Sequence, residues 1–388
     1  MQLPEEVREI LLCLQQAGYR GWAVGGCVRD LLRGQEPHDW DLCTDALPEQ
    51  TIEVFRGEQL AAPGFAHGTV TLVRREIPYE ITTLRAETRY SDGRHPDGVE
   101  FVVDLAKDLA RRDFTVNSMA MDLTGKVTDC FGGQKDLAAG VLRCVGEPNR
   151  RFSEDGLRIL RALRFAAVLG FSIHPATAAA LHCQKERLGC VSAERITHEV
   201  MAMLEGVKVG AVCKAYPDIL AQILPGEWDG RLCDALNSLP PDALTRLCFV
   251  RAVLGKRAVS GLRLSRMQGQ ILEQVAAHWQ ACARTRADLL YLAGQVGWKT
   301  TERLLACRKA AGEEIDNAGF ARLAAENPCC TVAQLSVDGR TLAQMGAKGP
   351  QIGQLLHTLL NEVIKGQTLN TPPALAARAA ALLANSLF

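Results

Sequence analysis

Runs that favour β-strands are confined to the first 145 residues of this 388-residue chain, and this division limits the folds that it can adopt. Between Trp22 and Arg143, short runs rich in β-branched residues alternate with turn signals. The runs are TVTLV (69–73), YEITTL (79–84), VEFVV (99–103), KVTDCF (126–131) and VLRCV (141–145). After Arg151 apolar residues recur at helical spacing, and no convincing strand follows. The pattern predicts an α+β protein with a small mixed-sheet head and a long all-α part.

A chain of this length exceeds what one compact core usually covers, so several domains are expected. We predict a head at 1–145, a helical neck at 146–206, a helical body at 207–310 and a helical tail at 311–388. The first residues, MQLPEEVREILLCL, carry acidic residues where a signal peptide carries basic ones, so we interpret them as part of the mature protein. Their apolar residues recur at helical spacing, and we expect a helix that ends near Gly18. The sequence has no apolar run of about 18 residues, so we expect a cytoplasmic protein without a membrane partner.

Charge is balanced over the whole chain, with 44 basic and 44 acidic residues. A nucleic-acid partner would therefore have to be held by a local basic patch. Basic residues do cluster, at Arg111 and Arg112, at Arg150 and Arg151, and at Arg158, Arg161 and Arg164. The 14 cysteines include no CxxC pair, which favours buried small hydrophobic side chains, with disulfides or zinc as the alternatives.

The segment AVGGCVRDLLRGQEPHDWDL (23–42) joins a glycine turn, a short helical stretch and two aspartates. If DWDL is a strand, its period of two places Asp39 and Asp41 on one face, roughly 7 Å apart. Two carboxylates so placed repel each other unless they bind a cation, and hard oxygen ligands suit Mg²⁺. The glycine pair, which includes Gly26, lets the backbone approach a phosphate, and Arg29 follows in the next helix. The alternative is a solvated turn beside a simple loop.

A second charged segment, RFSEDGLRILRALRF (151–165), has arginines at helical spacing. We expect Ser153 to cap a single helix here. One face of that helix would carry Asp155, Arg158, Arg161 and Arg164. An exposed ladder of ion pairs is the alternative, but three arginines exceed what one aspartate can neutralise. The spacing therefore favours an anionic ligand.

Taken in order, these motifs resemble the tRNA nucleotidyltransferase (CCA-adding) and bacterial poly(A) polymerase family, the class II branch of the polymerase-β-like superfamily. The matching motifs are GGCVRD with DWD, HGTVTLV with YEITTLR, RRDFTVNSMA, DCFGGQKDL with VLR, and RFSEDGLRILRALRFAAVLGF. The resemblance implies that Asp39 and Asp41 bind catalytic magnesium and that Glu80 supplies a third carboxylate. The implied reaction is an in-line attack of an RNA 3′-hydroxyl on the α-phosphate of a nucleoside triphosphate, without a covalent intermediate.

The resemblance also assigns Arg112, Arg161 and Arg164 to the nucleotide, and Asp155 with Arg158 to the reading of its base. Cytosine and adenine both present an amino donor beside a ring-nitrogen acceptor, whereas uracil and guanine present the inverse pattern. A carboxylate only accepts hydrogen bonds and a guanidinium only donates them. An aspartate–arginine pair is therefore expected to take C and A and to reject U and G.

Asp113 follows two arginines in RRDFTVNSMA (111–120), and we expect it to accept a hydrogen bond from a ribose hydroxyl, which would select ribonucleotides. A charged surface turn is the alternative for Arg112 and Asp113. In DCFGGQKDLAAGVLR (129–143), the glycine pair matches a hinge-like motif of the family between head and neck. His198 and Glu199 begin a zinc-protease pattern but lack its second histidine, so they are interpreted as a chance match.

Three features favour a CCA-adding enzyme within the family. The polar segment 85–101 matches the flexible loop associated with A addition, the chain ends without a basic extension, and residues 335–370 resemble the tail of the CCA-adding group. We therefore expect addition of C, C and A to the 3′ end of tRNA from CTP and ATP with Mg²⁺ as cofactor, and we infer no protein partner. The alternatives are a poly(A) polymerase, a CC-only or A-only relative, and a catalytically idle RNA-binding protein.

The tail carries a glycine-rich turn before a helical stretch, formed by Gly346, Gly349, Pro350 and Gly353. We expect this turn to bring a helix N-terminus against an RNA phosphate, with a tightly packed helical turn as the alternative.

Overall fold

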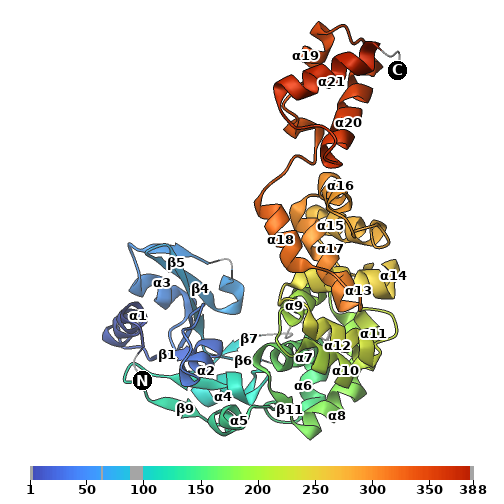
Figure 1. The fold of residues 1–388 in the computed structure, drawn as a ribbon. Coiled ribbons are helices and arrows are strands. Elements are labelled where there is room, and N and C mark those ends of the chain that lie inside the picture. Colours follow the sequence, from blue (N-terminus) through green and yellow to red (C-terminus); the bar gives the residue numbers. More distant parts are fainter. Residues whose placement is uncertain (1–2, 63, 88–98, 385–388) are drawn as a thin grey trace. The chain divides into compact units, whose positions relative to one another are not determined.

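The computed structural model describes residues 3–62, 64–87 and 99–384 (Figure 1). Contacts divide the chain into two units, one of Met1–Cys233 with Gly261–Arg263 and the other of Asp234–Ser260 with Leu264–Phe388. No helix within the described ranges is long and apolar enough to cross a membrane.

A seven-stranded mixed sheet forms the N-terminal part of the first unit. Its strands are β1 (Gly21–Val24), β2 (Asp41–Thr44), β3 (Gln59–Ala61), β4 (Thr69–Arg74), β5 (Ile77–Thr83), β8 (Met119–Met121) and β9 (Val127–Asp129). They lie in the order β3-β4-β5-β2-β1-β8-β9, with β2 parallel to β5 and the other neighbours antiparallel. The predicted mixed-sheet head is confirmed.

The alternation of side chains along these strands buries both faces of the sheet. On one face, Ala23 and Leu42 belong to a core shared with α1 (Glu5–Gln16) and α2 (Gly26–Leu32). On the other face, Trp22 and Cys43 pack with Leu109 of α4 (Leu105–Ala110). Because both faces are covered in the middle, the polar side chains of β2, Asp41 and Thr44, lie at its two ends.

Two short ladders accompany the main sheet. In the first, β6 (Arg85–Glu87) pairs antiparallel with β7 (Val99–Phe101); these strands are the ends of the predicted flexible segment, whose residues 88–98 lie outside the described residues. In the second, β10 (Val141–Leu142) pairs in parallel with β11 (Ser172–Ile173). The sequence predicts no strand after Arg151, so β11 is an exception. It forms because Gly170 ends the preceding helix with φ +73° and returns the chain to β10.

The rest of the first unit is helical, as predicted, and α7 packs against both α6 and α9 (Figure 1). Its remaining helices are α3 (Pro48–Val54), α5 (Gly133–Ala139), α6 (Pro148–Glu154), α7 (Leu157–Leu169), α8 (Pro175–Gln184), α9 (Ala193–Leu204), α10 (Val209–Ala215) and α11 (Pro217–Ile223), and α12 (Gly230–Ser238) follows. Short 3₁₀ turns lie at Phe65–His67, Thr115–Asn117 and Lys185–Cys190.

The second unit contains only helices and turns among its described residues. They are α13 (Ala243–Leu254), α14 (Lys256–Val259), α15 (Arg266–Ala277), α16 (Arg286–Val296), α17 (Trp298–Ala310), α18 (Asn317–Ala325), α19 (Gly339–Gln344), α20 (Pro350–Ile364) and α21 (Pro372–Ala384), with a 3₁₀ turn at Val332–Gln334. Leu290, Leu342 and Leu355 belong to one core that joins its C-terminal helices. The predicted all-α part of the chain is therefore confirmed.

The cysteines behave mainly as small hydrophobic residues. Eight of the 14 are buried, and two more are partly buried. Burial raises the pKa of the Cys27 thiol to about 11, with a further rise from Asp41, so this thiol stays protonated at neutral pH.

Candidate active site

A cavity of about 430 Å³ in the first unit is lined by the glycine turn before α2, by the loop after α4 and by α7. Seven arginines and three aspartates line it: Arg29, Arg111, Arg112, Arg158, Arg161, Arg164, Arg195, Asp41, Asp113 and Asp155. Gly25, Gly26, Asn117, Leu157 and Phe165 complete the wall. Nine of the eleven predicted site residues lie here, and Asp39 and Glu80 do not line the cavity.

The glycine turn lies directly against two of the predicted site residues. Gly25 connects β1 to α2 with φ +86°, a backbone conformation that favours glycine. A Cβ atom on Gly25 would lie 3.2 Å from Nη1 of Arg112 and 3.8 Å from Oδ2 of Asp41. The missing side chain therefore leaves room for a guanidinium and a carboxylate at the same piece of backbone.

Two of the three predicted metal-binding carboxylates come from neighbouring strands. Asp41 opens β2 and pairs with Glu80 of the parallel strand β5, which places both side chains on one face of the sheet. Asp39 lies in a bend before β2, so the expected DWDL strand is wrong in its first half. The strand starts late because β1 leaves the sheet at Gly25 and offers no neighbour to the residues before Asp41.

The pKa values show that these carboxylates act on one another. Burial raises the pKa of Asp41; Arg112 and Arg161 oppose the rise, and Asp39 adds to it. Burial also raises the pKa of Glu80, and Asp41 and Asp39 raise it further. A divalent cation would relieve this repulsion, and carboxylate oxygens are suitable ligands for Mg²⁺. Among the described residues no three histidine, cysteine or acidic side chains already form a closed ligand set, so a cation here would need ligands from a bound molecule.

The predicted single helix at 151–165 is in fact two helices. α6 ends at Glu154 and α7 begins at Leu157, and the cap of α6 is Glu147. Ser153 lies inside α6, where its hydroxyl donates to the carbonyl of Arg150 at 2.8 Å, so its predicted role as the cap is wrong. A glutamate that accepts two backbone N–H groups replaces it.

Asp155 occupies the break between the two helices. Its backbone is extended, with φ −144° and ψ 108°, and its Oδ1 accepts the N–H of Leu157 at 3.0 Å. Gly156 permits the break, because a Cβ atom there would lie 2.6 Å from the carbonyl oxygen of Arg187. Asp155 is therefore not on the same helix as the three arginines of α7, but the break still presents its carboxylate to the cavity.

The predicted base-reading pair is already engaged with other groups. Asp155 accepts from Arg195, with Nη2–Oδ2 at 2.9 Å and Nη1–Oδ1 at 3.4 Å. Arg158 donates from Nη1 to Glu154 at 2.8 Å. It also donates to the carbonyl oxygens of Arg151 and Arg111, each at 3.1 Å. Both side chains are thus fixed in the cavity wall.

Arg161 and Arg164 extend the basic wall along α7. Arg161 donates to Asp113 at 2.7 Å, and the Nε of Arg164 forms an ion pair at 2.7 Å with Oε2 of Glu199. Burial acts to lower the pKa of Arg161, but Asp113 and Glu199 reverse this effect and raise it. For Arg164 burial prevails and lowers the pKa. Arg164 also lies 4.1 Å from the ring centre of Phe165.

One cavity arginine retains an unused donor. The buried Nε of Arg112 has no hydrogen-bond partner among the described residues, whereas the Nε of Arg164 is held by its ion pair with Glu199. Arg112 is oriented by Asp108, which accepts from its Nη2 at 3.2 Å. Burial acts to raise the pKa of Asp108, but Arg111 and Arg112 hold it below its usual range. Unused buried donors are rare in proteins, so an anionic ligand is the natural partner.

Arg29 differs from the arginines of α7 because it lies on α2 and is held by its neighbour in sequence, Asp30. It is the fourth residue of α2, and Asp30 binds it through two hydrogen bonds at 2.9 and 2.8 Å. Its Nη1 donates to Oδ1 of Asn117 at 2.7 Å. Asn117 lies in the RRDFTVNSMA motif, so its polar side chain was a usable signal. Arg195 and Glu199 lie on α9, more than thirty residues past Arg161, and no motif predicted that they belong near the site.

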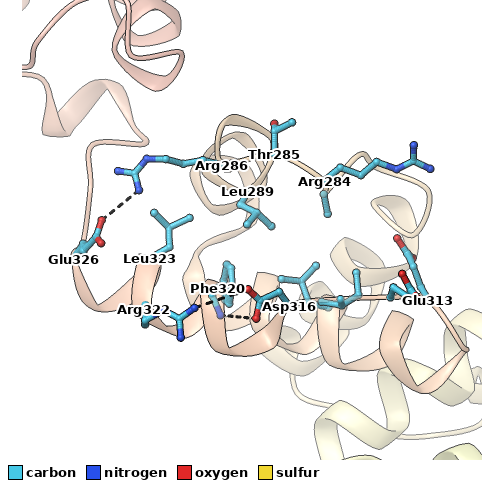
Figure 2. A pocket seen from close by; sticks show the side chains of 15 residues that line it. Arg284, Thr285, Arg286, Leu289, Glu313, Asp316, Phe320, Arg322, Leu323 and Glu326 are labelled. Carbon is cyan, nitrogen blue, oxygen red and sulfur yellow. Dashed lines mark hydrogen bonds and ion pairs between the residues drawn. The ribbon is translucent and has the colours of Figure 1, made fainter.

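A larger cavity, of about 830 Å³, lies in the second unit between α16 and α18 (Figure 2). Leu289, Leu323 and Phe320 line its apolar part. Its charges are compensated, because three arginines face four acidic residues around it. Arg286 lies 3.3 Å from Glu326, as the dashed line in Figure 2 marks, and both this pair and the pair of Arg322 with Asp316 are exposed.

Family models match both units of the chain. Residues 21–143 match the model for the poly A polymerase head domain. Residues 243–379 match the model for tRNA nucleotidyltransferase domain 2.

Similar proteins and solved structures cover nearly the whole chain. The CCA-adding enzyme of Levilactobacillus brevis is 35% identical over 401 residues, which cover 97% of this chain and 98% of the relative. The crystal structure of the Bacillus stearothermophilus CCA-adding enzyme in complex with CTP superimposes with a TM-score of 0.82 at 27% identity, covering 99% of this chain and 98% of that one. The fold is also that of the Thermotoga maritima CCA-adding enzyme complexed with tRNA, with a TM-score of 0.70 at 20% identity over 98% and 97% of the two chains.

Proposed function

The chain belongs to the CCA-adding enzymes, the class II tRNA nucleotidyltransferases, and from this we propose that it adds C, C and A to the 3′ end of tRNA, using CTP and ATP. The observation that supports this proposal best is the small arginine-rich cavity beside Asp41. Seven arginines against three aspartates in the wall, with the buried Nε of Arg112 unused among the described residues, suit a triphosphate. Two relatives of known structure were solved with CTP and with tRNA, which agrees with such a ligand.

The reaction requires a metal site beside the α-phosphate. We assign the binding of Mg²⁺ to Asp39 and Asp41, with Glu80 as a third carboxylate. When bound, Mg²⁺ would lower the pKa of the RNA 3′-hydroxyl and offset the charge of the pyrophosphate leaving group. The hydroxyl oxygen forms the new bond to the α-phosphorus as the bond to pyrophosphate breaks.

The arginines of the cavity hold and orient the triphosphate in this proposal. Arg112 lies against the glycine turn, 3.2 Å from the place where a Cβ atom of Gly25 would be, so a phosphate can contact both. Arg161 and Arg164 face the same cavity from α7. Asp113 would accept a hydrogen bond from a ribose hydroxyl. Its Oδ2 already accepts from Arg161, so the carboxylate of Asp113 would serve both donors.

Base choice is proposed to rest on Asp155 and Arg158. The carboxylate of Asp155 would accept from the amino group that cytosine and adenine share, and Arg158 would donate to the ring nitrogen beside it. Arg158 already donates to Glu154 and to two backbone carbonyls, and these bonds hold its guanidinium at the cavity wall before a base binds. A uracil or guanine would leave both groups facing the wrong partner, at a cost of about 1–3 kcal/mol for each lost bond.

The proposal includes the four parts predicted from sequence, a head at 1–145, a neck at 146–206, a body at 207–310 and a tail at 311–388. The tail is proposed to bind tRNA through its glycine turn. In support, Gly346 and Gly349 have φ +103° and +52°, and Gly349 directly precedes the 15-residue helix α20.

The test is incorporation of single nucleotides into tRNA that lacks its terminal CCA, with Mg²⁺ present. We expect incorporation of C and A that stops after three residues, while U and G remain nearly inert. Long A tails would identify a poly(A) polymerase instead, and a stop after two C residues would identify a CC-only enzyme. No incorporation at all would refute the proposal and favour an idle RNA-binding protein.

A further inference from the structure

Helix α9 carries two oppositely charged side chains at the proposed nucleotide cavity, although neither was predicted from sequence: Arg195 lines the cavity, and Glu199 is buried beside two arginines that line it. Arg195 and Glu199 lie four residues apart on α9, so they share one face of the helix, and α9 packs against α7 (Figure 1). Arg195 binds Asp155 in the break before α7. Glu199 lies 2.7 Å from Arg164 and 3.8 Å from Arg161, both on α7.

The position of Arg195 is unfavourable for its own helix. It is the third residue of α9, and a cation in the first helical turn is disfavoured by the helix dipole. Asp155 compensates for this, because two of its oxygens accept from the guanidinium. One oxygen also accepts the N–H of Leu157, so the carboxylate plane is fixed from two sides. The remaining lone pairs of the Asp155 carboxylate therefore point in a fixed direction, and the amino group of a base must approach along it.

The position of Glu199 is equally constrained. Its side chain is 5% exposed, and its partners are the two arginines of α7. Its Oε2 has no hydrogen bond among the described residues, although Arg164 is close, so the contact with Arg164 is an ion pair without hydrogen-bond alignment. A buried carboxylate between two guanidiniums reduces their mutual repulsion and keeps them on the cavity side of α7.

Building on the function proposed above, we propose that Arg195 and Glu199 are positioning residues with separate tasks. Arg195 fixes the carboxylate of Asp155 and thereby the choice of base. Glu199 fixes Arg161 and Arg164 and thereby the affinity for the triphosphate, which all four nucleotides share. Helix α9 would then set selectivity with one side chain and affinity with the other.

The test for Arg195 is the substitution Arg195→Lys in the full chain. Lysine keeps the charge but cannot bind both oxygens of Asp155 as the guanidinium does. We expect kcat/KM for C relative to U, and for A relative to G, to fall about tenfold, which corresponds to one misdirected hydrogen bond. Wild-type ratios in a folded Arg195→Lys enzyme would overturn the assignment.

The test for Glu199 is the substitution Glu199→Gln, which keeps the shape and removes the charge. We expect KM to rise about fivefold to tenfold for each of the four nucleotides, since one charged interaction is lost for all of them, with unchanged C/U and A/G ratios. If the variant does not fold, Glu199→Asp provides the same test with a retained charge at a shorter reach. A change of base ratio as large as that of Arg195→Lys would refute the separation of tasks.

His198→Ala is the matched control on the same helix. His198 lies between the two residues in sequence, is exposed, and has no hydrogen bond or ion pair among the described residues. We expect it to change neither the ratios nor KM. Equilibrium titration of the full-length wild type and variants with CTP and UTP gives a second measurement. If the wild type transfers no nucleotide, the proposed function fails. The role of α9 can still be decided by the titration, because a loss of CTP preference over UTP in Arg195→Lys would support it and an unchanged preference would refute it.

Discussion

Two cavities of this protein, one in each unit, differ more in charge than in any other property that matters for function. The cavity in the second unit is about twice as large, 830 against 430 Å³. Its three arginines are outnumbered by four acidic residues, and Arg286 lies 3.3 Å from Glu326. In the wall of the smaller cavity arginines exceed aspartates by seven to three, and the buried Nε of Arg112 has no hydrogen-bond partner among the described residues.

Arginines that face a cavity while many of their carboxylate partners lie behind them make the cavity wall electropositive, which favours an anionic ligand. The excess of guanidiniums over carboxylates at the wall, rather than volume, therefore distinguishes the proposed site of this chain. The two cavities are therefore expected to respond differently to mutation. Changes in the smaller cavity should affect nucleotide transfer strongly, and changes in the larger one should affect only stability.

The largest effect is expected for Asp41→Asn. This substitution removes the charge that would hold the metal ion, so we expect the rate of nucleotidyl transfer to fall by about a thousandfold or more. Because burial and Asp39 raise the pKa of Asp41, the ionised form of this carboxyl group is destabilised in the absence of metal. The unfolding midpoint measured in EDTA should therefore stay the same or rise. Retained turnover would remove Asp41 from the metal site.

Much of the smaller cavity could be predicted from the sequence, because its residues belong to short motifs that follow one another in a fixed order. The glycine turn, Asp41, Arg112 and the arginines of α7 each lie inside a motif whose spacing is local. The same holds for the sheet, whose strands at 69–74 and 77–83 follow their β-branched runs.

The errors arose where tertiary contacts override local signals. Ser153 looked like a helix cap, but the close approach of Gly156 to the backbone of Arg187 breaks the helix two residues later. The partners on α9, Arg195 and Glu199, are fixed only by packing of α9 on α7, for which the sequence contains no local pattern. A pattern of a few residues cannot reveal a partner that is brought near by packing alone.

The second effect is expected for Asp108→Asn. Asp108 is fully buried and holds Arg111 and Arg112 at the rim of the smaller cavity. Removing one member of such a buried pair costs about 3–5 kcal/mol, which urea unfolding at neutral pH would measure. The pKa of Asp108 is lowered in the fold. Its stabilisation is therefore complete above the unfolded pKa of about 4 and is lost as pH falls further. The difference between wild type and variant should shrink toward pH 3, and a constant difference would contradict this account.

The third effect separates the two cavities by their ligands. We expect inorganic triphosphate to raise the unfolding midpoint, by an amount equivalent to about 2.7 kcal/mol at a hundred times its dissociation constant. Arg164→Gln should reduce this shift because it removes a donor from the smaller cavity. Arg322→Gln is the matched control, since Arg322 lines the larger cavity and lies 4.0 Å from Asp316. An equal loss in both variants would mean that the anion binds elsewhere or at several places.

The smallest effect is expected in the larger cavity, for Asp316→Ala. Asp316 is 75% exposed, and its Oδ1 caps α18 by accepting the N–H of Gly319 at 2.8 Å. Loss of a helix cap costs about 1 kcal/mol, so the unfolding midpoint should fall slightly while nucleotidyl transfer is unchanged. Arg286→Gln, which removes an exposed ion pair, should change stability by about 0.5 kcal/mol or less. If Asp316→Ala slowed transfer in a folded enzyme, the compensated cavity would also serve the reaction, and charge balance would no longer distinguish the two.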